Sequence, residues 1–142
     1  MNLQRFHDAQ RDSYAGALME VRAGRKTSHW MWYIFPQLGG LGFSATSAHY
    51  AIADLDEARA YLEDPVLGAR LREITRAALD HADRLEATDI FGSVDAQKLR
   101  SCWTLFNQVD PASERLFEQG LTRFFGGRAD PRTLQLLGLD AS

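Results

Sequence analysis

The sequence predicts an all-α fold, with one domain over residues 1–142 and six or seven helices around one core. Apolar residues recur at steps of three, four or seven along most of the chain, which is the spacing of a helix face. Aspartate–proline pairs precede three of these stretches. Only residues 30–35 could alternate as a strand, and a short capped helix fits them as well.

In the first half of the chain, a helix is predicted over residues 8–23. Gly24 is expected to close it, because glycine readily adopts the left-handed conformation found at helix C-termini. Asp54 can cap a short helix by accepting a hydrogen bond from an unpaired backbone N–H.

In the second half, helices are predicted to begin at Asp64-Pro65, Asp110-Pro111 and Asp130-Pro131. Aspartate favours the N-cap, and proline fits the first helical position because it has no N–H to leave unpaired. Ser93 can cap a further helix whose apolar stripe is Leu99, Cys102, Trp103, Phe106 and Val109.

The ends of these helices are marked by leucine spacing and by glycine. The helix from Pro65 is predicted to extend to Leu85, which is about five turns. Gly126-Gly127 should end the next one, and the closing helix should run from Pro131 to Gly138.

The composition disfavours several classes of function. The net charge is -3 at pH 7, so no positive field would attract nucleic acid or an anionic membrane. No signal peptide is expected, and no apolar run reaches the roughly 18 residues of a membrane span. The single cysteine, Cys102, predicts a core position in a reducing, cytoplasmic protein.

Residues 28–44 are the strongest candidate for a binding site. They combine Trp30 and Trp32 with a histidine, a glutamine and a glycine run. Aromatic rings supply rigid apolar walls, and glycines let backbone approach a ligand closely. The segment can equally be a short hydrophobic helix that is buried on all sides, with Gln37 satisfying backbone groups.

The glycines and hydroxyls that follow match no known phosphate loop. Gly40 and Gly42 precede no Gly-Lys-Ser/Thr and follow no strand, so neither a Walker loop nor a dinucleotide motif is present. Ser44 either caps a short helix or helps to hold an anion at its N-terminus.

The four histidines have neither paired spacing nor cysteine partners, so no metal site and no cofactor are predicted. His29 lies within the aromatic block, where it is a candidate general acid or base because its pKa can be tuned to neutral pH. A capping or core role for His29 is the alternative.

A second polar group lies on the helix after Ser93. Lys98 and Ser101 repeat at a spacing of three residues beside the apolar stripe, and Asp95 stands three residues before the lysine. This ridge is either a solvated face or a cationic, hydroxyl-bearing ligand surface in which Asp95 holds Lys98.

Several longer strings carry a resemblance to a known family. They are Phe6-x-x-Ala9-Gln10-x-x-x-Tyr14, Gly24-Arg25-Lys26-Thr27-Ser28-His29-Trp30-Met31-Trp32-Tyr33-Ile34-Phe35-Pro36-Gln37, Gly40-Leu41-Gly42-x-Ser44, Tyr61-Leu62-x-x-Pro65-x-Leu67-x-x-Arg70-Leu71, Ile90-Phe91-Gly92-x-x-Asp95-x-x-Lys98-Leu99-x-Ser101 and Gly127-x-x-Asp130-x-x-Thr133. With these strings the chain resembles the bacterial and fungal DUF1810 family over nearly its whole length. The resemblance implies a mainly helical single domain and supplies no mechanism.

The function predicted from these residues is the binding of a small polar or anionic metabolite, in a cleft between residues 28–44 and the helix starting near Ser93. Lys26 and Lys98 would meet negative charge, while Gln37, Ser44 and Ser101 would orient the ligand. Hydrolysis or group transfer with His29 as acid or base is an extension of this hypothesis. The alternative is a non-enzymatic interaction or self-association module that uses the tryptophan-rich segment. The sequence does not decide the oligomeric state.

Overall fold

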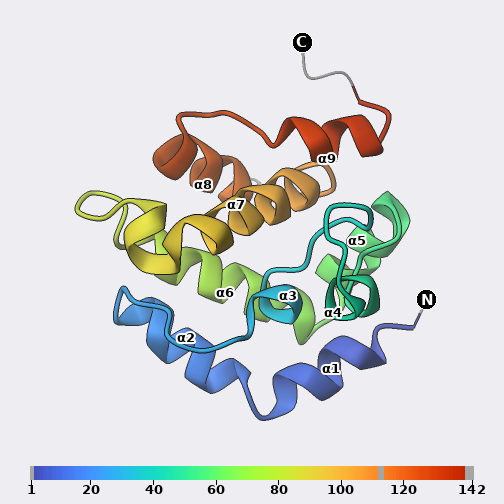
Figure 1. Ribbon diagram of the computed structural model, residues 1–142, viewed down its shortest axis with the longest axis horizontal. Helices are drawn as coiled ribbons and strands as arrows, with labels where there is room; N and C mark the ends of the chain where they lie inside the picture. The colour runs from blue at the N-terminus through green and yellow to red at the C-terminus, as the bar shows by residue number, and fades with distance from the viewer. Residues whose placement is uncertain (1, 112–113, 140–142) are drawn as a thin grey trace.

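The computed structural model describes residues 2–111 and 114–139, and within them the chain is helical and forms no β-strand (Figure 1). The helices are α1 (Gln4–Arg11), α2 (Tyr14–Arg22), α3 (Met31–Ile34), α4 (Ala45–His49), α5 (Leu55–Glu63), α6 (Leu67–Leu79), α7 (Ala87–Asn107), α8 (Leu116–Phe125) and α9 (Pro131–Leu136). The all-α class is confirmed. The number of six or seven is wrong, because these residues form nine helices: the predicted helix over 8–23 is two helices, and Ser44 caps a further short helix, α4.

One hydrophobic core joins these helices. α7 crosses the molecule between α6 and α8 in Figure 1, and it packs against α5, α8 and α9. The apolar side chains of the core extend without interruption from Phe6 in α1 to Phe124 in α8, and they include the fully buried Trp103. Burial of this apolar surface is the main source of stability in such a fold.

The predicted helix over residues 8–23 is two helices, which is a correction to the sequence prediction. α1 begins earlier, at Gln4, and ends at Arg11, and α2 begins at Tyr14. Between them, Ser13 Oγ donates a hydrogen bond to the Ala9 carbonyl at 2.6 Å. Such side-chain bonds to the backbone compete with the helical pattern, and here the chain turns.

The three aspartate–proline pairs behave differently from one another. Asp130 caps α9 as predicted, with Pro131 in the first turn. Asp64 accepts hydrogen bonds from two backbone N–H groups before α6, although that helix ends at Leu79 and not at Leu85. Asp110 starts no helix, since it is buried and paired with Arg72 at 3.0 Å.

Three other helix predictions can be compared with the structure: the helix after Asp110, the helix after Ser93 and the segment 30–35. The predicted helix after Asp110 begins only at Leu116, where Arg115 takes a left-handed conformation with φ 51°. α7 contains a break at Gly92, whose φ of 80° is not helical, so a second helical stretch starts at the predicted Ser93. The segment 30–35 contains the short helix α3 and no strand.

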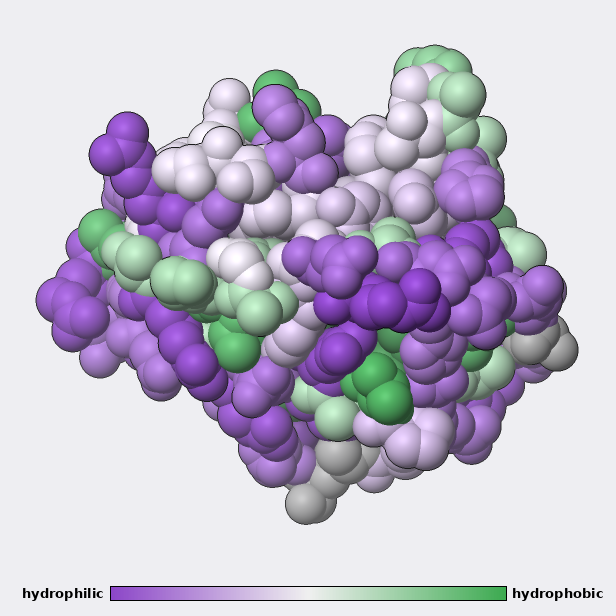
Figure 2. All heavy atoms as spheres, turned by 90° about the horizontal axis from the view of Figure 1, so that it is seen from below, coloured by the Kyte–Doolittle hydropathy of each residue, from purple (hydrophilic) through white to green (hydrophobic). Residues whose placement is uncertain are grey.

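One face of the molecule is mainly hydrophilic (Figure 2). In Figure 2, which looks at the molecule from below α1 and α2 of Figure 1, apolar residues lie in small groups among hydrophilic ones. Among the described residues, no helix is both long enough and apolar enough to cross a bilayer.

Candidate functional site

Residues 28–44 and the second part of α7 meet at one cavity of about 400 Å³. The cavity is lined by Trp32, Gln37 and Leu41 from the first segment, by Val94, Gln97, Lys98 and Ser101 from α7, and by Asp130 and Arg132 at the start of α9. The volume lies within the range typical of small-molecule sites.

The α7 residues reach the cavity because of their spacing. Val94, Gln97, Lys98 and Ser101 follow one another at intervals of three, one and three residues, which places them on one helix face. The neighbouring face carries Leu99, Cys102 and Trp103 into the core. The same helix therefore holds both the core and the cavity wall, and the position of the wall follows from the packing.

Two lysines share one carboxylate beside the cavity. Asp95 accepts Lys26 Nζ at 2.8 Å on one oxygen and Lys98 Nζ at 3.2 Å on the other. Each ammonium also lies over a tryptophan ring, Lys98 at 4.3 Å from the Trp32 ring centre and Lys26 at 4.8 Å from that of Trp30. These contacts hold Lys98 against the cavity and Lys26 behind it.

Gln37 lines the cavity and also carries an unpaired polar atom. Its residue is 5% exposed, and its buried side-chain nitrogen Nε2 has no hydrogen-bond partner among the described residues. Its backbone is fixed, because the Gln37 carbonyl accepts a hydrogen bond from Ile52 N at 2.9 Å. A buried donor without a partner costs about 1–3 kcal/mol.

Ser101 contacts a buried carboxylate at the end of the cavity. Ser101 Oγ donates to Asp130 at 2.9 Å, and Thr133 Oγ1 donates to the same oxygen at 2.6 Å. The Asp130 N–H in turn donates to Thr104 Oγ1 at 2.8 Å. Asp130 therefore has its acceptors largely occupied, while Lys98 and Gln37 offer donors.

Asp130 and Arg132 were not among the predicted site residues. The sequence signal at Asp130 was real, but it is the signal of a helix cap, and the residue does serve as one. Its position at the cavity depends on α9 packing against α7, a contact between residues some 30 positions apart in the chain. An exposed arginine one residue after a proline carries no signal of its own.

The remaining predicted residues lie outside the 400 Å³ cavity. Gly40 and Gly42 line a smaller cavity of about 90 Å³, to which Trp32 and Gln37 also contribute. A Cβ at Gly42 would lie 2.6 Å from Ser47 Cβ, so that glycine serves a close approach within the chain. Ser44 caps α4 by accepting Ser47 N at 3.0 Å, and His29 is exposed and not part of either lining.

Trp30 lies in the core and outside the cavity lining. It is 3% exposed, and its indole N–H donates to Glu20 at 3.0 Å. The same carboxylate accepts hydrogen bonds from Ser28 Oγ and from the backbone of Thr27 and Ser28. Burial by itself would raise the pKa of Glu20, but these hydrogen bonds lower it to about 2.

The single cysteine of the chain is not part of the cavity lining. Cys102 is fully buried, and burial raises the pKa of its thiol well above the ordinary range. A buried thiol is inert, because the thiolate is the nucleophile. In residues 2–111 and 114–139, no group of three or more His, Cys, Asp or Glu side chains is placed to hold a metal ion.

Comparison with known proteins identifies the family. A family described as "Protein of unknown function (DUF1810)" matches residues 1–137. The chain belongs to the DUF1810 family. Its fold is similar to the crystal structure of the conserved hypothetical protein Rv1873 from Mycobacterium tuberculosis, with a TM-score of 0.91, 42% sequence identity and 96% of each chain covered. No curated protein matches the chain.

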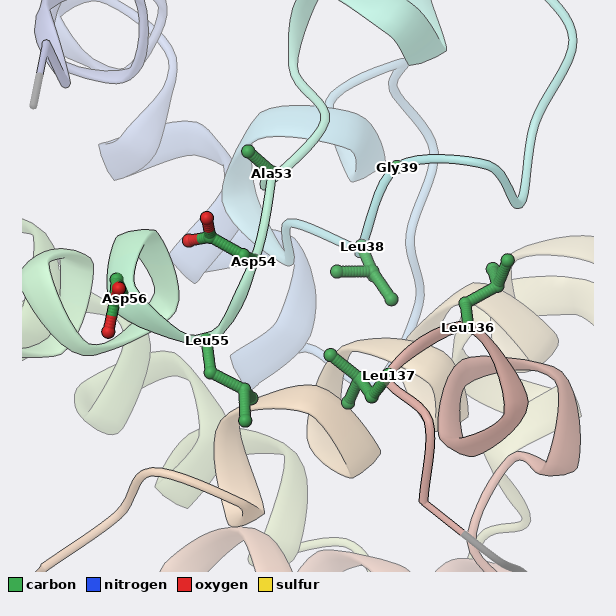
Figure 3. Close-up of a pocket in the computed structure, with 8 residues that line it drawn as sticks. All are labelled: Leu38, Gly39, Ala53, Asp54, Leu55, Asp56, Leu136 and Leu137. Carbon is green, nitrogen blue, oxygen red and sulfur yellow. The ribbon is translucent and has the colours of Figure 1, made fainter.

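This DUF1810 protein has another cavity, of about 370 Å³, which differs in character (Figure 3). Leu38, Leu55 and Leu137 come together there from three distant parts of the chain. Its two carboxylates have partners, since Asp54 caps α5 and Asp56 pairs with Arg59 at 3.0 Å. It offers no unpaired buried polar group comparable to Gln37.

Proposed function

We propose that this DUF1810 protein binds a small polar or anionic metabolite in the cavity between residues 28–44 and α7. The observation that carries the proposal is the Gln37 amide, which is buried, fixed by its backbone, unpaired at Nε2 and part of the lining. Buried polar groups in native proteins have partners in most cases, and an exception at a cavity points to a ligand.

The charges around the cavity favour an acceptor-rich ligand. Lys98 and Arg132 contribute donors only, and so does Gln37 Nε2. The carboxylate of Asp130 is already bonded to Ser101 and Thr133. A carboxylate or phosphate oxygen would therefore find donors on several sides, and charge-assisted hydrogen bonds are the stronger kind.

Trp32 and Leu41 complete the site on its apolar side. Trp32 is partly exposed and lies beneath the Lys98 ammonium, so its ring edge remains available to an apolar part of the ligand. A few placed polar groups within a mainly apolar wall are typical of sites that orient a small molecule.

The alternative function, an interaction module that uses an exposed tryptophan surface, has less support. Trp30 is buried and bonded to Glu20, and Trp32 lines the cavity. These two rings therefore do not form the flat exposed surface that such a module would need.

The test replaces Gln37 with methionine, which keeps the length of the side chain and removes the amide. Without ligand, Gln37→Met should be as stable as the natural protein or up to about 2 kcal/mol more stable, because no donor is left unpaired. In a thermal-shift screen, small carboxylates or phosphate esters that bind should raise the melting temperature of the natural protein and not that of the variant. A ligand at a hundred times its Kd raises stability by about 2.7 kcal/mol.

Tryptophan indole signals in ¹⁵N NMR spectra report where a ligand from the screen binds. Trp30 and Trp103 donate their indole N–H groups to Glu20 and Thr75 within the protein, and Trp32 lines the cavity. Binding at the proposed site should shift the Trp32 signal and leave the other two unchanged. The proposal fails if ligands stabilise Gln37→Met equally, or if none of them moves the Trp32 signal.

A further inference from the structure

We infer that the cavity selects a singly charged anion, with a small monocarboxylate as its ligand class, and that Lys26 sets this choice from outside the cavity. The inference rests on the proposed function and names the ligand class for the same site. It depends on the charges that line the cavity and on the ion pairs that those charges make.

The formal charges in and next to the cavity sum to plus one. Lys98 and Arg132 line the cavity with the carboxylate of Asp130, and Asp95 is ion-paired to Lys98. Lys26 adds a third cation through its 2.8 Å contact with Asp95. Three cations thus stand against two carboxylates, and one positive charge is left for a ligand.

A single positive charge in a half-enclosed site favours a monoanion over a dianion. The attraction between ligand and site grows in proportion to the ligand charge, whereas the cost of removing the ligand from water grows with the square of that charge. A dianion would also leave one negative charge without a counter-charge. A neutral analogue would gain hydrogen bonds from Gln37 and no ionic attraction.

Lys26 has the contacts expected of a residue that tunes charge. Its side chain is 8% exposed, and its ammonium is held by Asp95 and by the face of Trp30. It occupies one oxygen of Asp95, which leaves the other for Lys98. Without Lys26, the whole negative charge of Asp95 would act on Lys98, and the site would have no net charge. Lys26 is therefore a positioning residue, since it acts through Asp95.

The test uses three probes of similar length and of charge zero, minus one and minus two: butyramide, butyrate and succinate. Their Kd values are measured from the shift of the Trp32 indole signal. In the natural protein, butyrate should bind about tenfold more tightly than butyramide and more tightly than succinate. Lys26→Met should weaken butyrate binding about tenfold and leave butyramide unchanged.

Two further variants separate charge from structure. Lys26→Arg keeps the charge and should restore the natural preference. Asp95→Asn adds a positive charge to the site, so it should shift the preference toward succinate, and it serves as the test if Lys26→Met does not fold. An unchanged Trp103 signal shows that each variant retains the fold, because the Trp103 indole N–H is bonded to Thr75 and contacts neither Lys26 nor Asp95.

The outcomes distinguish this inference from the proposed function. If none of the probes moves the Trp32 signal, the proposed function fails and this inference fails with it. If the probes bind and the ratio of butyrate to succinate affinity is the same in Lys26→Met and Asp95→Asn as in the natural protein, only the inference fails.

Discussion

At the scale of single residues, the side chains of the site differ in their hydrogen bonds. Lys98 and Ser101 are bonded to neighbouring side chains, whereas the Gln37 amide nitrogen has no partner among the described residues. Asp95 holds Lys98, and Asp130 holds Ser101, both at hydrogen-bond distance. Gln37 has a fixed backbone and a free amide nitrogen. Under the proposed function, this contrast makes Gln37 the residue whose substitution separates stability from binding, because its amide has no partner among the described residues.

His29 belongs to the residue scale as a prediction still to be tested. It is exposed and outside the cavity lining, so His29→Ala should change the free energy of unfolding by less than about 0.5 kcal/mol. It should also leave the Trp32 indole shift on ligand binding unchanged. Urea unfolding and the NMR titration check both statements. If His29→Ala abolishes turnover of a bound metabolite while binding persists, the acid or base role gains support; loss of binding would contradict the assignment of the site.

At the scale of elements, the site depends on the orientation of the second part of α7, which follows from its packing against α6 and α8. The break at Gly92 allows the stretch from Ser93 to take its own direction, and Trp103 anchors this stretch in the core. The Trp103 indole N–H donates to Thr75 in α6 at 3.1 Å, and Gly120 of α8 lies against the ring. The cavity face of α7 is therefore oriented by contacts on its opposite face.

Gly120→Ala tests the packing of Trp103 between α7 and α8. A Cβ at Gly120 would lie 2.6 Å from the Trp103 ring, which cannot move freely because of its bond to Thr75. Overpacking of this kind should lower the free energy of unfolding by about 1–3 kcal/mol. Gly16→Ala in α2 is the matched control, because a Cβ there meets no atom within 4 Å. The control should stabilise the protein by about 0.5–1 kcal/mol. Equal urea midpoints for the two variants would contradict the argument.

At the scale of the whole molecule, carboxylates tie distant segments together. Glu20 of α2 binds residues 27–30, and Asp64 binds both the start of α6 and His7 of α1. Burial alone would raise the pKa of Asp64, but hydrogen bonds from the backbone of Leu67 and from His7 lower it. Both carboxylates are therefore more acidic in the folded protein than in the unfolded chain.

The consequence is a loss of stability in acid. The pKa of Glu20 falls from 4.5 in the unfolded chain to about 2 in the fold. Its contribution is fully present above about pH 4.5 and is lost as the pH falls toward 2. After a discount for solvent screening, this contribution is about 2 kcal/mol. Urea unfolding between pH 2 and 7 measures it, and Glu20→Gln should flatten the curve over that range. An equally steep curve in Glu20→Gln would assign the acid sensitivity to other groups.

Much of the local structure could be predicted because its causes are local. Asp54 and Asp130 cap their helices, and Gly24 and Gly126 have the positive φ expected after a helix end. The failures have non-local causes. Asp110 resembles a cap in the sequence, but its place beside Arg72 of α6 is set by the packing of the core.

The sequence by itself determined the helical class, most helix ends and the two polar segments, because spacing, caps and glycines act within a few residues. The tertiary structure decided which polar residues share a cavity, and it added Asp130 and Arg132 while leaving His29 and Ser44 outside. The reason is that a cavity wall is built from segments far apart in the chain. Their meeting depends on how the apolar faces of α7, α8 and α9 pack, and no short stretch of sequence records that packing.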